Sequence, residues 1–259
     1  LYIVIGDVKR EGKLQNFRDG PDPDDTGVIL RVNPEDGSSV PDNPFINRNN
    51  NLSSLNKYYA YGIRNSFGIT FDPITGTLWQ TENGPTEYDE VNVVKPGFNS
   101  GWNKVMGPIS KSDITVEDEL VNFPNSKYAD PVFSWFPSLG ITDIEFLNSS
   151  KLGDKYDNNI FVGDIGDLTE GNLYYFELNE DRTGMKFDNI SSSRSSNNNQ
   201  TILSDLIADN EEELSATVFG TAFGGITDIE TGPDGFLYIL TLDREADGEG
   251  KIYRLTDIR

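Results

Sequence analysis

The sequence predicts an all-β protein, and two observations carry that prediction. The candidate strands are short runs of β-branched and aromatic residues that end at Gly, Asp, Asn or Pro, and the 3.6-residue periodicity of a helix is almost absent. A phrase that opens with Gly-Ile-Thr also recurs along the chain, at Gly68–Pro73, Gly140–Glu145 and Gly225–Glu230. This recurrence indicates an internal repeat whose units each begin with a strand.

Each repeat continues with further strand-like segments. The second strand is expected at Gly76–Thr81, Asn159–Gly163 and Gly235–Leu240. The third is expected at Asp89–Val94, Asn172–Leu178 and Gly250–Leu255. Strand sets that repeat with turn residues at matching places are typical of propeller blades, each of which buries its faces against its neighbours.

Upstream of the first repeat, Leu1–Gly6 and Gly27–Val32 are expected to be the remaining strands of an earlier blade. The count is then about three and a half blades, whereas propellers close with roughly four to eight. We therefore expect residues 1–259 to be a single propeller domain that lacks its N-terminal part. Irregular stretches lie at 103–130 and 179–216, and the polar run Ser191–Asn199 within the second is not expected to bury a core.

Composition excludes several kinds of chemistry. The 259 residues include no His and no Cys, so they supply no thiolate nucleophile, no Ser/His pair and no ordinary zinc site. With 43 acidic residues against 21 basic ones, carboxylates are plentiful. A metal bound here would have oxygen ligands, which suit calcium or magnesium.

The formal net charge of −22 argues against some partners. Such a surface repels nucleic acid and anionic membranes, and its simplest explanation is a solvated, saline-adapted exterior. No apolar run reaches the roughly 20 residues of a membrane span, so membrane insertion is not expected. The chain is expected to be extracytoplasmic, and Asn-x-Ser/Thr sequons that fit secretion lie at Asn51, Asn148, Asn189 and Asn199.

A long ordered block of motifs surrounds the first repeat. It comprises Gly62–Gly68, Phe71–Pro73, Thr81–Pro85, Asp89–Asn92 and Gly97–Trp102. This block resembles the glucose/sorbosone dehydrogenases, also called soluble aldose sugar dehydrogenases, and weaker matches extend the resemblance to Leu1–Asp7 upstream and Gly232–Tyr238 downstream. The resemblance implies an all-β, six-bladed β-propeller of which this chain holds about the C-terminal two thirds.

The resemblance also implies an activity. In that family pyrroloquinoline quinone (PQQ) lies over one end of the central channel with a calcium ion, and an aldose sugar is oxidised at its anomeric carbon by hydride transfer. Carried onto this chain, the carbonyls of Gly84 and Pro85 would hold that calcium, Arg64 and Asn65 would contact the quinone, and Glu90 would bind a second, structural calcium. Arg64 is accordingly the one candidate catalytic residue within the chain. The sugar, the electron acceptor and a homodimeric state stay open.

The chemistry of the candidate site residues also allows an interpretation that does not depend on the resemblance. A Gly-Pro pair presents carbonyls without a donor at Pro85, which suits a hard cation, although an ordinary turn has the same composition. Arg64 is a planar, permanent cation that can hold a carboxylate or a quinone oxygen, and an ion pair is its simpler role. Glu90 could be solvated, and Trp79 and Trp102 are expected to pack within blades.

Three departures from the family pattern matter. The general base of the family is a histidine upstream of the strand at Leu1–Asp7, outside this chain. Where a lysine faces the cofactor this chain has Asp164–Asp167, and in place of an Arg-x-Arg it has Gly225–Asp228. PQQ carries three carboxylates, so loss of these cations weakens the case for that cofactor. Two alternatives to a dehydrogenase therefore stay open. One is a non-catalytic calcium-binding propeller that binds carbohydrate or a surface partner, and the other is a calcium-dependent hydrolase that uses Asp143, Asp164 and Asp228.

Overall fold

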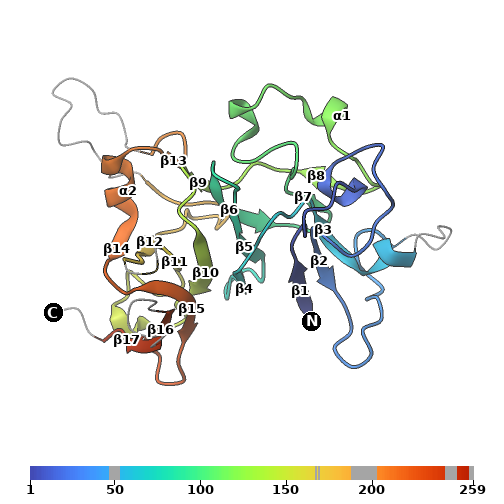
Figure 1. Cartoon of the computed structure of the whole chain (residues 1–259). Helices are drawn as coiled ribbons and strands as arrows, with labels where there is room; N and C mark the ends of the chain where they lie inside the picture. The colour runs from blue at the N-terminus through green and yellow to red at the C-terminus, as the bar shows by residue number, and fades with distance from the viewer. Residues whose placement is uncertain (47–52, 167, 169, 188–202, 243–249, 257–259) are drawn as a thin grey trace. The chain divides into compact units, whose positions relative to one another are not determined.

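The computed structural model describes residues 1–46, 53–166, 168, 170–187, 203–242 and 250–256 (Figure 1). The sequon residues Asn51, Asn189 and Asn199, the run Ser191–Asn199 and Asp167 lie outside the described residues. The chain forms two compact units. The first consists of Leu1–Ser66 and Val94–Pro131, and the second of Phe67–Val93 and Val132–Arg259.

The first unit contains one five-stranded sheet in the order β1-β2-β3-β7-β8. Its strands are β1 (Tyr2–Ile5), β2 (Val28–Arg31), β3 (Tyr58–Tyr61), β7 (Phe98–Asn99) and β8 (Lys127–Tyr128). The first three strands pair antiparallel, whereas β7 and β8 add in parallel. The expected strands β1 and β2 are therefore present, and the sheet is completed by segments that were not predicted as strands.

The second unit contains three sheets, with strand orders β13-β9-β6-β5-β4, β10-β11-β12-β14 and β15-β16-β17. The first comprises β4 (Ile69–Phe71), β5 (Leu78–Asn83), β6 (Asp89–Val94), β9 (Phe133–Trp135) and β13 (Ile207–Ala208). The second comprises β10 (Ile141–Phe146), β11 (Ile160–Asp164), β12 (Leu173–Phe176) and β14 (Val218–Gly220). The third comprises β15 (Gly225–Thr231), β16 (Leu237–Leu242) and β17 (Gly250–Arg254). Each recurring Gly-Ile-Thr phrase thus opens one sheet, as the repeat predicted.

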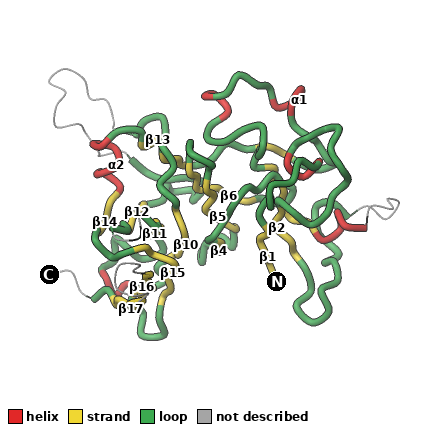
Figure 2. The backbone as a smooth tube through the Cα atoms, in the orientation of Figure 1, coloured by secondary structure: helices red, strands yellow, loops and turns green. Residues whose placement is uncertain are grey.

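The protein is mostly β rather than all-β (Figure 2). Short α-helices occur at α1 (Val116–Glu119) and α2 (Glu211–Thr217), and 3₁₀ turns occur at Lys13–Gln15, Ser53–Lys57, Ile109–Lys111 and Ser150–Leu152. Asn210 caps the N-terminus of α2, where its side chain accepts hydrogen bonds from the Glu212 and Glu213 amides. Among the described residues, no helix has both the length and the apolar character that a membrane crossing requires.

Aromatic side chains dominate the core of the second unit. Trp79 and Trp135 are fully buried, and the ring of Trp135 lies 4.9 Å from that of Phe133 and 5.2 Å from that of Tyr174. The contact with Tyr174 joins β9 to β12 and therefore connects two of the sheets, and Trp79 on β5 belongs to the same buried cluster. The packing role predicted for Trp79 is confirmed.

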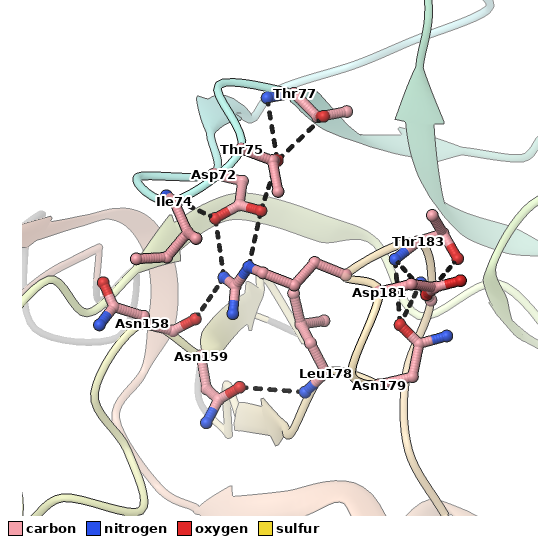
Figure 3. A network of polar contacts seen from close by, with 12 residues as sticks. Asp72, Ile74, Thr75, Thr77, Asn158, Asn159, Leu178, Asn179, Asp181 and Thr183 are labelled. Carbon is pink, nitrogen blue, oxygen red and sulfur yellow. Dashed lines mark hydrogen bonds and ion pairs between the residues drawn. The ribbon is translucent and has the colours of Figure 1, made fainter.

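A buried ion pair also joins these two sheets (Figure 3). Asp72 lies in the turn between β4 and β5, and Arg182 follows β12. The Arg182 guanidinium donates from Nε to Oδ2 of Asp72 at 2.7 Å and from Nη2 to Oδ1 at 2.8 Å. It also donates to the Asn158 carbonyl, between β10 and β11, at 2.6 Å. One cation therefore binds both the β4–β5 turn and the β10–β11 connection.

Candidate functional site

Arg64 lies in the first unit, shortly after β3, and its guanidinium stacks on an indole. Its Cζ atom is 5.3 Å from the centroid of the Trp102 ring. The Trp102 indole N–H donates to Oδ2 of Asp7 at 2.8 Å, and the Asp7 amide donates to the Arg64 carbonyl at 2.8 Å. Sequence reasoning predicted only packing for Trp102 and missed this arrangement, although Trp102 closes the motif block.

Gly62 permits this contact. Its φ is +74°, and a Cβ atom there would lie 2.3 Å from Asn99 Oδ1 and 2.9 Å from the Gly101 amide nitrogen. Only glycine therefore allows segment 99–102 to lie this close to the end of β3. The Trp102 amide donates to the Gly62 carbonyl at 3.2 Å, which fixes the indole next to Arg64. Asn65, the other predicted quinone contact, is half-buried in the same unit.

Gly84 and Pro85 lie in the second unit, in the loop between β5 and β6. Gly84 is buried and Pro85 is exposed. A Cβ atom on Gly84 would lie 2.0 Å from the Glu87 carbonyl oxygen and 2.2 Å from that of Tyr88. The loop therefore curls so tightly that only glycine fits at position 84. A calcium ion at this loop would take its ligands from the Gly84 and Pro85 carbonyls, because the described residues contain no group of three or more acidic side chains that could hold a metal.

Asp89 fixes this loop. Its buried carboxylate accepts hydrogen bonds from the Gly84 amide at 3.0 Å and from the Ser138 hydroxyl at 2.7 Å. It also accepts from the amides of Leu139, Gly140 and Ile141 at 2.6, 2.7 and 3.3 Å. Hydrogen bonds to a charged acceptor are stronger than neutral ones, so Asp89 ties the start of β6 to both the Gly84 loop and the segment that leads into β10.

Glu90 belongs to a buried polar cluster, which consists of Gln80, Glu82, Glu90, Asn92 and Ser134 on the neighbouring strands β5, β6 and β9. Gln80 donates to Glu82 at 2.8 Å, Asn92 donates to Glu90 at 2.9 Å, and Ser134 lies opposite Glu90 in the β6–β9 register. Glu90 is 1% exposed, so the solvated alternative is wrong.

The oxygens of this cluster are incompletely satisfied. Within the described part of the chain, Gln80 Oε1, Asn92 Oδ1 and Ser134 Oγ have no hydrogen-bond partner. A buried polar atom without a partner is costly, and a cation with oxygen ligands would satisfy all of these atoms together with the carboxylates. The cluster therefore fits the structural calcium that the resemblance implies for Glu90.

The acidic residues of the hydrolase hypothesis do not come together as one group. Asp143 on β10 and Asp228 on β15 are neighbours: burial raises the pKa of Asp143 to about 7, and the Asp228 carboxylate contributes to that rise. Asp164 is instead engaged by Asn172, whose amide and side chain donate at 2.8 and 3.0 Å, and by the Tyr174 hydroxyl. Asp164, which opens the segment that stands in place of the family's cofactor-facing lysine, is thus a structural acceptor.

The predicted site residues therefore fall into two groups. Arg64 and Asn65 lie in the first unit, and Gly84, Pro85 and Glu90 lie in the second. Their convergence on one cofactor stays a prediction.

Comparison with known proteins agrees with the resemblance. A family described as Glucose / Sorbosone dehydrogenase matches residues 1–254. The aldose sugar dehydrogenase YliI of Escherichia coli is 27% identical over 252 residues, which cover 96% of this chain and 55% of that protein. The chain spans about half the length of the curated relatives it matches.

Solved structures show the same fold. A crystal structure of glucose dehydrogenase superposes with a TM-score of 0.66 at 22% identity, over 99% of this chain and 61% of that one. The PQQ-bound form of the aldose sugar dehydrogenase from Streptomyces coelicolor superposes with a TM-score of 0.58 at 21% identity, over 98% of this chain and 57% of that one. The present fold therefore corresponds to about 60% of those chains.

Proposed function

Because this chain belongs to the glucose/sorbosone dehydrogenase family, we propose that it forms part of a PQQ- and calcium-dependent oxidoreductase that oxidises an aldose at its anomeric carbon. The E. coli relative is an aldose sugar dehydrogenase, and the S. coelicolor structure holds PQQ. Those properties belong to the relatives, and they support the same activity here.

The fold that we propose for the whole enzyme is a six-bladed β-propeller, of which this chain forms about the C-terminal two thirds. The four sheets of the described residues, and the match to 57–61% of the solved dehydrogenase chains, support this proposal. The general base is proposed to be a histidine outside the 259 residues, since the chain contains none.

The observation that carries the proposal is the buried polar cluster around Glu90, in which Gln80 Oε1, Asn92 Oδ1 and Ser134 Oγ have no hydrogen-bond partner within the described residues. In the proposed enzyme the Gly84 and Pro85 carbonyls hold a calcium ion at the cofactor, and Glu90 with its polar cluster holds a second, structural calcium. Bound PQQ would supply the acceptor for the two electrons that leave the sugar.

Arg64 and Asn65 are proposed to hold the anionic oxygens of the cofactor. The guanidinium is a permanent cation with in-plane donors, so it binds carboxylate or quinone oxygens and stabilises negative charge that develops on them. The Arg64 guanidinium lies over the Trp102 ring, with its Cζ atom 5.3 Å from the ring centroid.

The remaining proposals concern the setting of the enzyme. Its substrate is a small sugar, its surface binds neither nucleic acid nor membrane interior, and it works outside the cytoplasm. The net charge of −22 supports these proposals, and a homodimer is compatible with them.

One observation favours a second candidate. Asp164 is buried and saturated by Asn172 and Tyr174, so this position offers no cation to a PQQ carboxylate. A propeller that keeps the calcium sites, lacks catalysis, and binds carbohydrate or a surface partner would show this pattern.

Calorimetric titration of the complete propeller that contains this chain with PQQ, in calcium and then in a calcium chelator, separates the two candidates. We expect calcium-dependent binding that Arg64→Ala weakens roughly 10- to 100-fold, because a charge-assisted contact is lost. Arg31→Ala, which removes an exposed ion pair with Asp42 in the same unit, is the matched control and should leave binding unchanged. Addition of aldoses should then reduce the bound quinone, as its absorbance reports; calcium binding without PQQ binding would favour the second candidate.

A further inference from the structure

Arg64 has a flexible side chain, yet three contacts around it form a closed ring. The guanidinium stacks on Trp102, the Trp102 indole N–H donates to Asp7, and the Asp7 amide donates to the Arg64 carbonyl. All of these residues lie in the first unit. Each member of the ring is thus held by the other two.

We infer that Trp102 and Asp7 are positioning residues that hold the Arg64 guanidinium in one orientation for an anionic ligand. The inference rests on the proposed function only for the identity of that ligand, PQQ. The contacts themselves are present in the chain without it. Neither Trp102 nor Asp7 needs to touch the ligand for this role.

The indole has a fixed orientation of its own. The Trp102 carbonyl accepts from the Asn16 side chain at 2.7 Å, and its amide donates to the Gly62 carbonyl at 3.2 Å. The side-chain N–H to Asp7 at 2.8 Å then sets the rotation of the ring. An indole held at its backbone and at its far edge offers a rigid face to a cation.

Asp7 contributes in two ways. Its two oxygens have separate partners, since Oδ1 accepts from the Lys9 amide at 3.1 Å and Oδ2 accepts from the indole. A carboxylate that accepts a hydrogen bond from the indole N–H also raises the electron density of the ring, and the strength of a cation–π contact depends on that density. The carboxylate therefore strengthens the cation–π contact of Trp102 with Arg64.

The stack decides where the donors of Arg64 point. An arginine side chain has several rotatable bonds, and ordering them on ligand binding costs affinity. With the Arg64 Cζ atom 5.3 Å from the Trp102 ring centroid, part of this ordering is already present in the free protein. A ligand carboxylate then meets a guanidinium that has less conformational freedom to lose.

The first test uses the protein without PQQ. In arginine-labelled protein, the Arg64 side-chain NMR resonances, assigned with Arg64→Lys, should carry an upfield ring-current shift. Trp102→Leu should abolish this shift, and Trp102→Phe, which keeps an aromatic face but loses the N–H to Asp7, should retain part of it. Phe236→Leu removes a similar stack on Arg254, at 4.4 Å in the second unit, and should leave the Arg64 resonances unchanged.

The second test is a mutant cycle on PQQ affinity, measured by calorimetry. Trp102→Leu should weaken binding roughly 3- to 30-fold in the wild-type background and should have no effect in the Arg64→Ala background. A merely structural role of Trp102 would weaken binding by the same factor in both backgrounds, and that result would overturn the inference. Trp102→Phe, which preserves most of the buried volume, should fall between wild type and Trp102→Leu.

The two tests fail independently of one another. If the complete propeller that contains this chain bound no PQQ, the proposed function would be overturned, and the ring-current shift alone would decide whether Trp102 orients Arg64. An Arg64 shift that Trp102→Leu leaves unchanged would overturn the inference even if PQQ bound tightly.

Discussion

Replacement of Arg182 by alanine tests what holds the first two sheets of the second unit together. The Asp72 side chain is 0% exposed and that of Arg182 is 16% exposed, so the pair is shielded from solvent. Burial alone would raise the pKa of Asp72, but the hydrogen bonds from Arg182 and Thr75 outweigh it and hold the pKa below its usual value. The carboxylate is therefore charged in the folded protein.

The expected cost follows from these contacts. Arg182→Ala removes both donors to Asp72, the donor to Asn158 and a stack on Phe146 at 5.6 Å, and it leaves the carboxylate buried with Thr75 and the Ile74 amide. Removing one partner of a buried ion pair costs about 3–5 kcal/mol. Because Arg182 is partly exposed, we expect about 3 kcal/mol, which corresponds to a fall in Tm of about 6–12 °C for a domain of this size.

Urea unfolding at pH 7 measures this value, and two comparisons sharpen it. Lys186→Ala removes an exposed ion pair with Glu177 in the same segment, and it should cost less than about 0.5 kcal/mol. The lowered pKa of Asp72 means that the ion pair stabilises the fold above the pKa of the unfolded chain and is lost as the pH falls. The difference between wild type and Arg182→Ala should therefore shrink below about pH 3.9. If Arg182→Ala cost no more than Lys186→Ala, or if its cost were independent of pH, Asp72 and Arg182 would not hold the sheets as argued.

Three further outcomes are expected. Burial raises the pKa of Asp143 to about 7, so the folded state keeps a proton that the unfolded chain releases, and the free energy of unfolding should fall as the pH rises from about 4 to about 7. Asp143→Asn should flatten that slope and stabilise the protein at pH 8 on the order of 1–2 kcal/mol in urea titrations, and an unchanged slope would contradict the assignment. Gly84→Ala should cost about 2–3 kcal/mol and remove the rise in Tm that calcium gives, since its Cβ has no space; a normal calcium response would refute the loop as a metal site. Asp89→Asn places an amide group among hydrogen-bond donors and should cost roughly 2–4 kcal/mol in the same titrations, whereas a loss below about 1 kcal/mol would show that the loop is fixed by other contacts.

The repeated strands could be predicted because their signal is local. Each Gly-Ile-Thr phrase begins a sheet, and β5, β11 and β16 follow it as expected. Strand β3 lies outside the repeat, and because all four of its residues are buried it also lacks the alternation of a half-exposed strand. The equally buried β5 and β11 were recognised through the repeat alone. Strands β7, β8 and β13 have two residues each and exist only through the partners they pair with, which no local pattern reports.

The site could be predicted only in part, for a similar reason. Arg64, Gly84 and Glu90 stand in a recognisable motif block, and their roles toward cofactor and calcium stay predictions. The residues that fix them act over long sequence separations: Asp7 is 95 residues from Trp102, and Asp89 is 52 from Ile141. Such contacts depend on the fold, so composition and spacing do not reveal them.

The order of the chain through its two units has a consequence for synthesis on the ribosome. The polypeptide leaves the first unit after Ser66 and returns to it at Val94, and β7 and β8 then pair in parallel beside β3. While residues 67–93 emerge, the outer edge of β3 has no strand to pair with, and an open strand edge invites association with other chains. The first unit is therefore vulnerable until Tyr128 has been made, and no single cleavage between Ser66 and Pro131 yields both units intact.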